Sequence, residues 1–503
     1  MTRWAWVIDQ TRCIGCHACT TACKSENDVP VGVFRTWVKN VEVGTFPEVK
    51  RHFAVLRCNH CEEPPCVEVC PVTAMYQRPD GLVDFDHDAC IGCKACMQAC
   101  PYDAIYMDPD SNTAAKCNFC SHRVDEGLLP ACVVVCPEEA LLFGDLEDPT
   151  SKVSRALKDH DVSVRRPEQG TRPHAFYIGA HDATLEPLAA RHEATYMWSD
   201  RPARDTRDRT PLPIYGEQPA PSARVAYDVP RQRVWGWPVS SYIWTKGIAA
   251  GLGMLVGVGA YVDLGVGRRV LNIAAPVVAL AFLGITGALL VGDLKRPERF
   301  WTILIRPQWR SWLARGAVVI TVYGALLTAW LAVAFIGSRA GLSMLAPLLI
   351  VAGAVTAGYT APLLAQCEGR DLWQSGLLLP HLFVHALVGG LAIVIVASAV
   401  GGFSPPRGLV DAFVVTAIVT AVLILADAFK RHHTSNARAA AHALTRGAQA
   451  RLFWLSLALG AVIAVPLAFA GGVGLLVAAL LALAGLWLHG HAFILAGQGP
   501  PIS

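Results

Sequence analysis

Sixteen of the seventeen cysteines in this 503-residue chain lie between Cys13 and Cys136, in four runs of four. In chain order the runs are Cys13, Cys16, Cys19 and Cys23; Cys58, Cys61, Cys66 and Cys70; Cys90, Cys93, Cys96 and Cys100; and Cys117, Cys120, Cys132 and Cys136. A [4Fe–4S] cubane needs one thiolate for each iron, and closely spaced cysteines can cover three corners while a more distant cysteine supplies the fourth. Three of the runs also end in Cys-Pro, which is typical of cysteine runs that bind [4Fe–4S] clusters. The sixteen thiolates therefore predict four [4Fe–4S] clusters.

Zinc sites and disulfides are the alternative uses for so many cysteines. Zinc favours paired Cys-x-x-Cys knuckles with a long spacer, often with histidine, whereas these runs contain a third close cysteine. A disulfide-bonded domain would be exported, and the N-terminus Met-Thr-Arg-Trp-Ala-Trp shows no apolar h-region, cleavage site or twin arginine. Gly15 and Gly92, in two Cys-Ile-Gly-Cys sequences, would let backbone amides approach cluster sulfurs. Clusters in a domain that is not exported are the favoured interpretation.

Composition divides the chain into two parts. The mean hydropathy is +0.38, with 53% hydrophobic and 17% charged residues. Of the 83 charged residues, 59 lie in the first 235 positions and 24 in the last 268, where none follows Arg451. This pattern excludes a single soluble domain, a disordered chain and a collagen-like chain. A net charge of +3 without a basic stripe indicates no nucleic-acid partner.

The second part contains apolar stretches long enough to cross a bilayer, separated by short polar turns. We expect eight transmembrane helices, at about 240–262, 270–292, 313–336, 343–366, 376–400, 409–429, 451–470 and 473–496. The segment 181–235 is rich in Pro, Arg, Asp and Ala, and we expect an extended strap, held by Tyr196, Trp198 and Tyr215, or else a mobile tether. The predicted domains are therefore 1–180, 181–235 and 236–503.

Basic residues in the short loops predict the orientation of these helices. On the side of the cysteine-rich domain stand Arg231, Arg233, Lys295, Arg296, Arg299, Arg306, Arg310, Arg315, Arg370, Lys430, Arg431, Arg438, Arg446 and Arg451. The opposite side has Arg268, Arg269, Arg339 and Arg407. We therefore expect a multi-pass protein of a prokaryotic plasma membrane, in contact with lipid, whose iron–sulfur domain faces the cytoplasm.

The cysteine runs, with Gly144-Asp145-Leu146-Glu147-Asp148-Pro149 and Gly170-Thr171-Arg172-Pro173, resemble the four-cluster electron-transfer subunits of molybdopterin oxidoreductases such as the polysulfide, dimethyl sulfoxide and formate enzymes. The resemblance implies an α+β ferredoxin-like domain in which runs share clusters. It implies four ligand sets: a first set of Cys13, Cys16, Cys19 and Cys136; a second set of Cys23, Cys117, Cys120 and Cys132; a third set of Cys58, Cys61, Cys66 and Cys100; and a fourth set of Cys70, Cys90, Cys93 and Cys96.

The second part resembles the polysulfide-reductase-type (NrfD-like) quinone-reactive membrane anchors, an all-α bundle. The matching stretches are Trp235-Gly236-Trp237-Pro238, Tyr242-Ile243-Trp244-Thr245-Lys246, Asp293-Leu294-Lys295-Arg296-Pro297-Glu298-Arg299-Phe300 and Gly369-Arg370-Asp371-Leu372-Trp373. That family binds no haem. Haem ligation by members of the pairs His381/His385 and His489/His491 is the alternative that the histidines would allow.

A quinone site needs hydrogen-bond donors and a proton route at the end of the bundle nearest the clusters. The candidate residues are Lys246, Tyr359, Asp293, His381, Arg296 and Arg299. Lys246 and Tyr359 would contact the quinone, and Asp293 and His381 would relay protons. The alternative is that Lys246 extends to the membrane surface and that the aspartate and arginines form a loop salt bridge.

We therefore expect a subunit that carries electrons between a catalytic partner and the menaquinone or ubiquinone pool. This chain shows no dinucleotide fingerprint and no candidate for the substrate chemistry. The resemblance alone implies that the catalytic partner carries a molybdenum or tungsten bis-pterin cofactor. A nickel–iron hydrogenase partner and a quinone-coupled proton pump are the alternatives. Cys367, the seventeenth cysteine, is expected to be an inert thiol.

Overall fold

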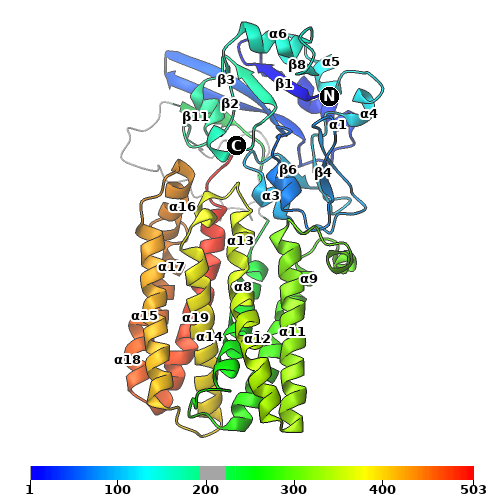
Figure 1. Ribbon diagram of the computed structural model, residues 1–503. Helices are drawn as coiled ribbons and strands as arrows, with labels where there is room; N and C mark the ends of the chain where they lie inside the picture. Colours follow the sequence, from blue (N-terminus) through cyan, green and yellow to red (C-terminus); the bar gives the residue numbers. More distant parts are fainter. Residues whose placement is uncertain (1, 192–222, 233) are drawn as a thin grey trace. The chain divides into compact units, whose positions relative to one another are not determined.

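The computed structural model describes residues 2–191, 223–232 and 234–503 (Figure 1). The chain forms two compact units. The first comprises Met1–Val234 together with the short segments Gln366–Arg370 and Pro500–Ser503, and the second comprises Trp235–Ala365 and Asp371–Gly499. The predicted anchors Tyr196, Trp198 and Tyr215 lie outside the described residues.

A four-stranded sheet is built around the first strand of the chain. Its order is β8 (Leu141–Asp145), β1 (Trp4–Asp9), β10 (Ala175–Ile178) and β9 (Val162–Ser163). Strand β1 pairs antiparallel with β8 and parallel with β10. Its residues Ala5–Ile8 are fully buried, which explains why this strand is a continuous apolar run rather than an alternating one.

The first unit has three smaller sheets, and the four cysteine runs lie in connections between successive strands. The strands of these sheets are β11 (Ala223–Tyr227), β2 (Thr36–Thr45) and β3 (Glu48–Arg57); β4 (Met75–Gln77) and β5 (Val83–Phe85); and β6 (Ile105–Met107) and β7 (Ala114–Lys116). Strand β11 belongs to the segment predicted as a strap, and it pairs antiparallel with β2. The end of β3 places Arg57 directly before Cys58.

The helices of the first unit are short. They are α1 (Ala18–Glu26), α2 (Pro65–Glu68), α3 (Ala95–Ala99), α4 (Ser121–Val124), α5 (Ala131–Val134), α6 (Lys152–Asp159) and α7 (Asp182–Leu185). Helices α1 and α3 begin at equivalent points of the two Cys-x-x-Cys-x-x-Cys runs. In both runs the glycine, Gly15 or Gly92, has φ +69. The left-handed backbone is the physical reason for these glycines, because side chains with a Cβ rarely adopt it.

The second unit is a bundle of long helices that run side by side (Figure 1). Its helices are α8 (Trp237–Val258), α9 (Ala275–Gly292), α10 (Thr302–Ile305), α11 (Trp312–Ile336), α12 (Arg339–Gly358), α13 (Thr360–Ala365), α14 (Leu378–Val400), α15 (Arg407–Phe429), α16 (Ser435–Thr445), α17 (Ala450–Leu457), α18 (Ala464–Phe469) and α19 (Gly472–Gly497). π-Helical turns at Val270–Ala274 and Ala458–Ile463 precede α9 and join α17 to α18.

Seven helical segments in the described part of the chain are long and apolar enough to cross a membrane. They are Val270–Gly292, Trp312–Ile336, Arg339–Ala365, Leu378–Val400, Arg407–Phe429, Ala450–Phe469 and Gly472–Gly497. The predicted count was eight, and the difference is α8. This helix carries Lys246 and several hydroxyl groups, and 16 of its 22 residues are buried. It packs against α9, α12, α14 and α19. Because neighbouring helices shield it, it needs less apolarity than a lipid-facing helix.

Candidate iron–sulfur and quinone sites

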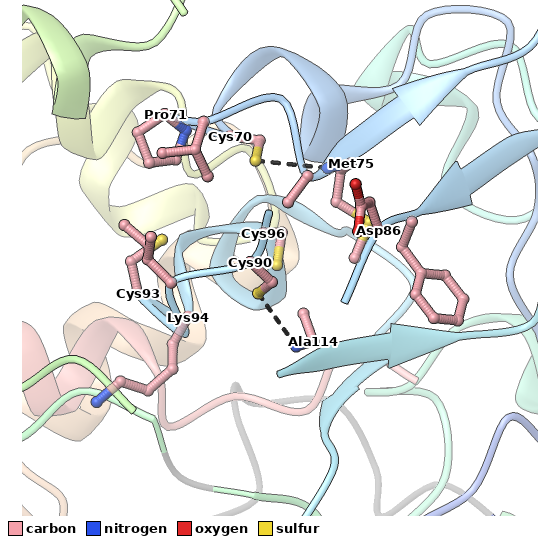
Figure 2. A pocket seen from close by; sticks show the side chains of 13 residues that line it. Cys70, Pro71, Met75, Asp86, Cys90, Cys93, Lys94, Cys96 and Ala114 are labelled. Carbon is pink, nitrogen blue, oxygen red and sulfur yellow. Dashed lines mark hydrogen bonds between the residues drawn. The ribbon is translucent and has the colours of Figure 1, made fainter. Parts of the chain in front are cut away.

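The four sulfurs of the fourth set line one cavity (Figure 2). Apolar side chains surround them, including Val72, Met75 and Ile91. Two backbone amides point at the sulfurs: Met75 N lies 3.5 Å from Cys70 Sγ, and Ala114 N lies 3.4 Å from Cys90 Sγ. The hairpins after the cysteine runs supply these amides, and such hydrogen bonds stabilise metal-bound thiolates.

The first and second sets each line a further cavity. In the first set, Ala140 N donates to Cys136 Sγ over 3.3 Å. In the second set, Asn27 Nδ2 lies 3.6 Å from Cys120 Sγ, and Arg57 Nη1 donates to Cys132 Sγ over 3.2 Å. Both cavities combine cysteines that are about a hundred residues apart in the chain.

The third set is also brought together, in the interior of the first unit. Cys61 interacts electrostatically with Cys58 and Cys100, and Cys66 with all three of the others. The fold therefore gathers three of the four implied sets around one cavity each, and it buries all four cysteines of the third set.

Burial makes these thiols weaker acids than an exposed cysteine. Burial raises the pKa of Cys19 to about 11 and that of Cys117 to about 12. It raises the pKa of Cys66 and Cys96 well above the usual value, and neighbouring cysteines add to this rise. Four such groups can be thiolates together only when a bound cation compensates their charge. Groups of four sulfur donors around one cavity, with backbone amides aimed at them, fit [4Fe–4S] clusters.

Lys246 and Tyr359 meet inside the second unit. Lys246 is only 1% exposed. Its Nζ donates to Thr360 Oγ1 over 2.6 Å and to Ala357 O over 3.1 Å, and it lies 4.2 Å from the centroid of the Tyr359 ring. The Tyr359 ring packs closely against Gly316 of α11. The lysine therefore points into the bundle rather than toward the membrane surface.

Three buried histidines lie in the same unit, on α14 and α19. The ring of His381 is 5.0 Å from that of His489 and 6.2 Å from that of His385. His385 packs beside Gly247, the neighbour of Lys246, since an added Cβ there would lie 3.6 Å from His385 Cδ2. His381 and His489 pack directly on each other, and His491 instead stacks on Trp487.

The remaining candidates follow α9 at its C-terminal end. Asp293 is the residue directly after the helix, and Arg296 lies 3.4 Å from the Glu298 carboxylate. Asp293, Arg296 and Arg299 are half-buried. The close contacts of Lys246 are thus with Tyr359, Thr360 and Ala357, while Arg296 forms an ion pair with Glu298, a residue outside the predicted site.

Two residues that contact candidate site residues were not predicted from the sequence. Thr360 follows Tyr359 and accepts the lysine's shortest hydrogen bond. Arg57 precedes Cys58 and touches a cysteine 75 residues away. The only signal in the sequence is adjacency to a candidate residue, and adjacency does not reveal which distant group a side chain will meet.

Comparison with known proteins covers both units. Residues 6–74 and 49–146 match models of 4Fe-4S dicluster domains, and residues 227–500 match the family "Polysulphide reductase, NrfD". This match and the seven apolar helices make the chain a multi-pass membrane protein.

Relatives of the N-terminal part are subunits of oxidoreductases. The chain is 46% identical over 202 residues to a subunit of the tetrathionate reductase of Salmonella typhimurium, covering 80% of that protein and 39% of this chain. It is 42% identical over 200 residues to a subunit of the sulfite dehydrogenase of Allochromatium vinosum, covering 83% of it and 35% of this chain. It is 38% identical over 226 residues to the arsenate respiratory reductase iron-sulfur subunit ArrB of Shewanella sp. strain ANA-3, covering 96% of it and 35% of this chain.

The NrfD family model matches residues 227–500, which are more than half of the chain. The chain therefore belongs to the polysulphide reductase NrfD family, and it carries 4Fe-4S dicluster domains ahead of the NrfD domain.

Proposed function

We propose that this chain is the electron-transfer and quinone-reactive anchor subunit of a respiratory oxidoreductase complex. The observation that carries the proposal is the presence, in one chain, of three cavities lined by four cysteines each, four further buried cysteines, and an apolar bundle with a buried lysine. The cysteines support one-electron transfer, and the buried lysine supports a polar ligand inside the membrane. The relatives are subunits of tetrathionate, sulfite and arsenate enzymes, which supports a separate catalytic subunit.

The four sets would each hold one [4Fe–4S] cluster, for sixteen irons in total. Bound clusters supply one-electron redox chemistry. The contribution of this chain is to hold the thiolates, to exclude water with apolar side chains, and to donate backbone hydrogen bonds to the sulfurs.

In the bundle, Lys246 and Tyr359 would donate hydrogen bonds to a carbonyl oxygen of menaquinone or ubiquinone. Reduction of a quinone requires two protons as well as two electrons, so the site also needs groups that exchange protons. His381, which has His385 and His489 beside it, would relay these protons. Asp293 would complete the route to water, and Arg296 and Arg299 would help to bind the quinone by stabilising the negative charge that develops on its oxygens during reduction.

We further propose that α8 spans the membrane with the seven more apolar helices, which gives eight spans and places both ends of the bundle on one side. Fourteen basic residues on the side of the cysteine-rich domain against four on the other support a cytoplasmic iron–sulfur domain.

The experiment that tests the function is anaerobic purification of the complex from membranes, followed by identification of its largest subunit and by metal analysis. We expect about sixteen irons per copy of this chain and a catalytic partner that contains molybdenum or tungsten. Nickel in the partner would assign the chain to a hydrogenase complex instead, and zinc in place of iron would contradict the cluster proposal.

A further inference from the structure

Arg57 is a fully buried cation next to the second set of cysteines. It is the last residue of β3, it is 0% exposed, and it lines the cavity of this set. Its Nη1 donates to Cys132 Sγ over 3.2 Å. The sulfurs of Cys117 and Cys19, from the second and first sets, also interact electrostatically with it. The guanidinium therefore adjoins the second set, and its charge also acts on Cys19 of the first set.

The orientation of the guanidinium is fixed by an aromatic ring. Its Cζ lies 4.3 Å from the centroid of Trp6 in the fully buried strand β1. Nε and Nη2 are also inaccessible to solvent, and no side chain or backbone group in the described part of the chain accepts a hydrogen bond from either nitrogen. A buried guanidinium without a carboxylate partner is costly, and donors left over beside a sulfur-lined cavity are suited to an anionic group inside it.

A second arginine at the cavity differs in this respect. Arg35 lines the same cavity, but its Nη1 donates to Asn27 Oδ1 over 3.0 Å and its Nε to Tyr106 Oη over 3.4 Å. These partners hold the guanidinium of Arg35, whereas the hydrogen bond formed by Arg57 goes directly to a predicted ligand.

The charge of Arg57 has a defined effect on one-electron reduction. A reduced cluster carries one more negative charge, and no bond is formed or broken. A positive charge and hydrogen bonds to the sulfurs stabilise the reduced form more than the oxidised form, which raises the reduction potential. The effect is strong where water is excluded, because the local dielectric constant is low.

We propose that Arg57 sets the reduction potential of the cluster held by the second set, and to a smaller extent that of the first set. The proposal rests on the cluster assignment made under the proposed function. Arg57 acts through Cys132 and is therefore a positioning residue rather than a catalytic one. It would make the second set a more favourable electron acceptor than its cysteines alone would allow.

The test is a redox titration of the intact purified complex with dithionite as reductant, followed by electron paramagnetic resonance. Arg57→Met removes the charge and replaces only the inner, apolar part of the side chain, and Arg57→Lys keeps the charge. The signal of the second set is identified as the one that Cys120→Ser alters. At the wild-type midpoint, we expect Arg57→Met to lower the ratio of reduced to oxidised second-set cluster about tenfold, which is 59 mV for a one-electron couple. Arg57→Lys should restore most of this loss.

Lys39→Met is the matched control. Lys39 is another fully buried cation of the first unit, on β2, and its electrostatic neighbours are Asp228, Arg165 and Arg231 rather than cysteines. Its loss should leave all four midpoints in place.

The iron content separates the two proposals. About sixteen irons in Arg57→Met with all midpoints unchanged would overturn the role of Arg57 and leave the cluster assignment intact, whereas fewer than sixteen irons in the wild-type complex would overturn the assignment itself. If Arg57→Met loses the second set, the neutral variant Arg57→Gln is titrated in the same way. An unchanged potential there, or loss of the set there too, would show that Arg57 is purely structural.

Discussion

The ammonium group of Lys246 lies against the ring of Tyr359, with 4.2 Å between Nζ and the ring centroid. The two residues come from different helical segments. The hydrogen bond from Lys246 Nζ to Thr360 Oγ1 holds the ammonium group in this position. A buried ammonium is expensive in a membrane domain, and its two acceptors, the Thr360 hydroxyl and the Ala357 carbonyl oxygen, are both neutral. This contact supports a functional role for Lys246, because a purely structural position would be served better by an apolar side chain.

Removal of either partner should slow quinone-linked turnover. We expect Lys246→Leu and Tyr359→Phe to lower it by one to two orders of magnitude, because each removes a hydrogen bond of about 1.5–3 kcal/mol if the acceptor becomes charged in the transition state. The iron content and the activity of the complex with an artificial dye should be unchanged. Turnover is measured with a water-soluble quinone in detergent.

Tyr261→Phe is the matched control for this prediction. Tyr261 follows the other end of α8, is 60% exposed, and donates its hydroxyl hydrogen bond to Ser343 O. The same loss of a hydroxyl there should not affect quinone turnover. Normal quinone kinetics in both Lys246→Leu and Tyr359→Phe would place the quinone elsewhere.

The pairing of distant runs predicts which cluster a single cysteine change will affect. Cys136 lines the same cavity as Cys13, Cys16 and Cys19. Cys136→Ser should therefore alter or remove the signal of the first set while the other three clusters keep theirs. Electron paramagnetic resonance of the reduced complex measures this.

Cys367→Ser provides the control, because Cys367 is the one cysteine that no predicted set uses. This variant should keep all sixteen irons. If Cys136→Ser instead altered the signal of the second-set cluster, which Cys117 and Cys120 are predicted to bind, the ligand pairing implied by the resemblance would be wrong.

Cysteine spacing was sufficient to predict cluster-binding runs and hydropathy to predict the helical bundle, since both patterns are local in sequence, whereas the ferredoxin-like fold was expected only from the family resemblance. They did not reveal the contact of Arg57 with Cys132, which depends on how β3 and α5 pack. Hydropathy also could not show that α8 is shielded by other helices, which is why lipid-facing and protein-facing spans were counted alike. Strand β11 was missed because five residues with short alternation give a weak signal within a polar segment.

Helices α8 and α14 approach so closely that a methyl group between them should be destabilising. An added Cβ on Gly251 would lie 1.8 Å from Ala386 O, and one on Gly390 would lie 2.5 Å from the Gly251 carbonyl carbon. Small residues permit this kind of backbone contact in membrane helices. Gly251→Ala should cost about 1–3 kcal/mol through overpacking, seen as a lower temperature of thermal aggregation in detergent.

The control for this prediction is Gly284→Ala in α9, where an added Cβ meets nothing within 4 Å. It should leave the aggregation temperature unchanged or raise it, because alanine favours helices more than glycine does. Equal behaviour of the two variants would contradict the close packing of α8 on α14.

The orientation of the iron–sulfur domain follows from charge and can be tested without purification. The basic residues on the side of this domain are expected to stay in the cytoplasm, because short loops rich in lysine and arginine are translocated poorly. A protease added to intact spheroplasts should therefore spare residues 1–235 and should cleave them only after lysis.

With an even number of spans, a C-terminal reporter that works only in the cytoplasm should also be active. If the domain were protected but the reporter were inactive, the two ends of the bundle would lie on opposite sides of the membrane. The number of spans would then be odd, and α8 or another helix would not cross. Cleavage of the domain from outside would reverse the orientation and require its export together with a partner.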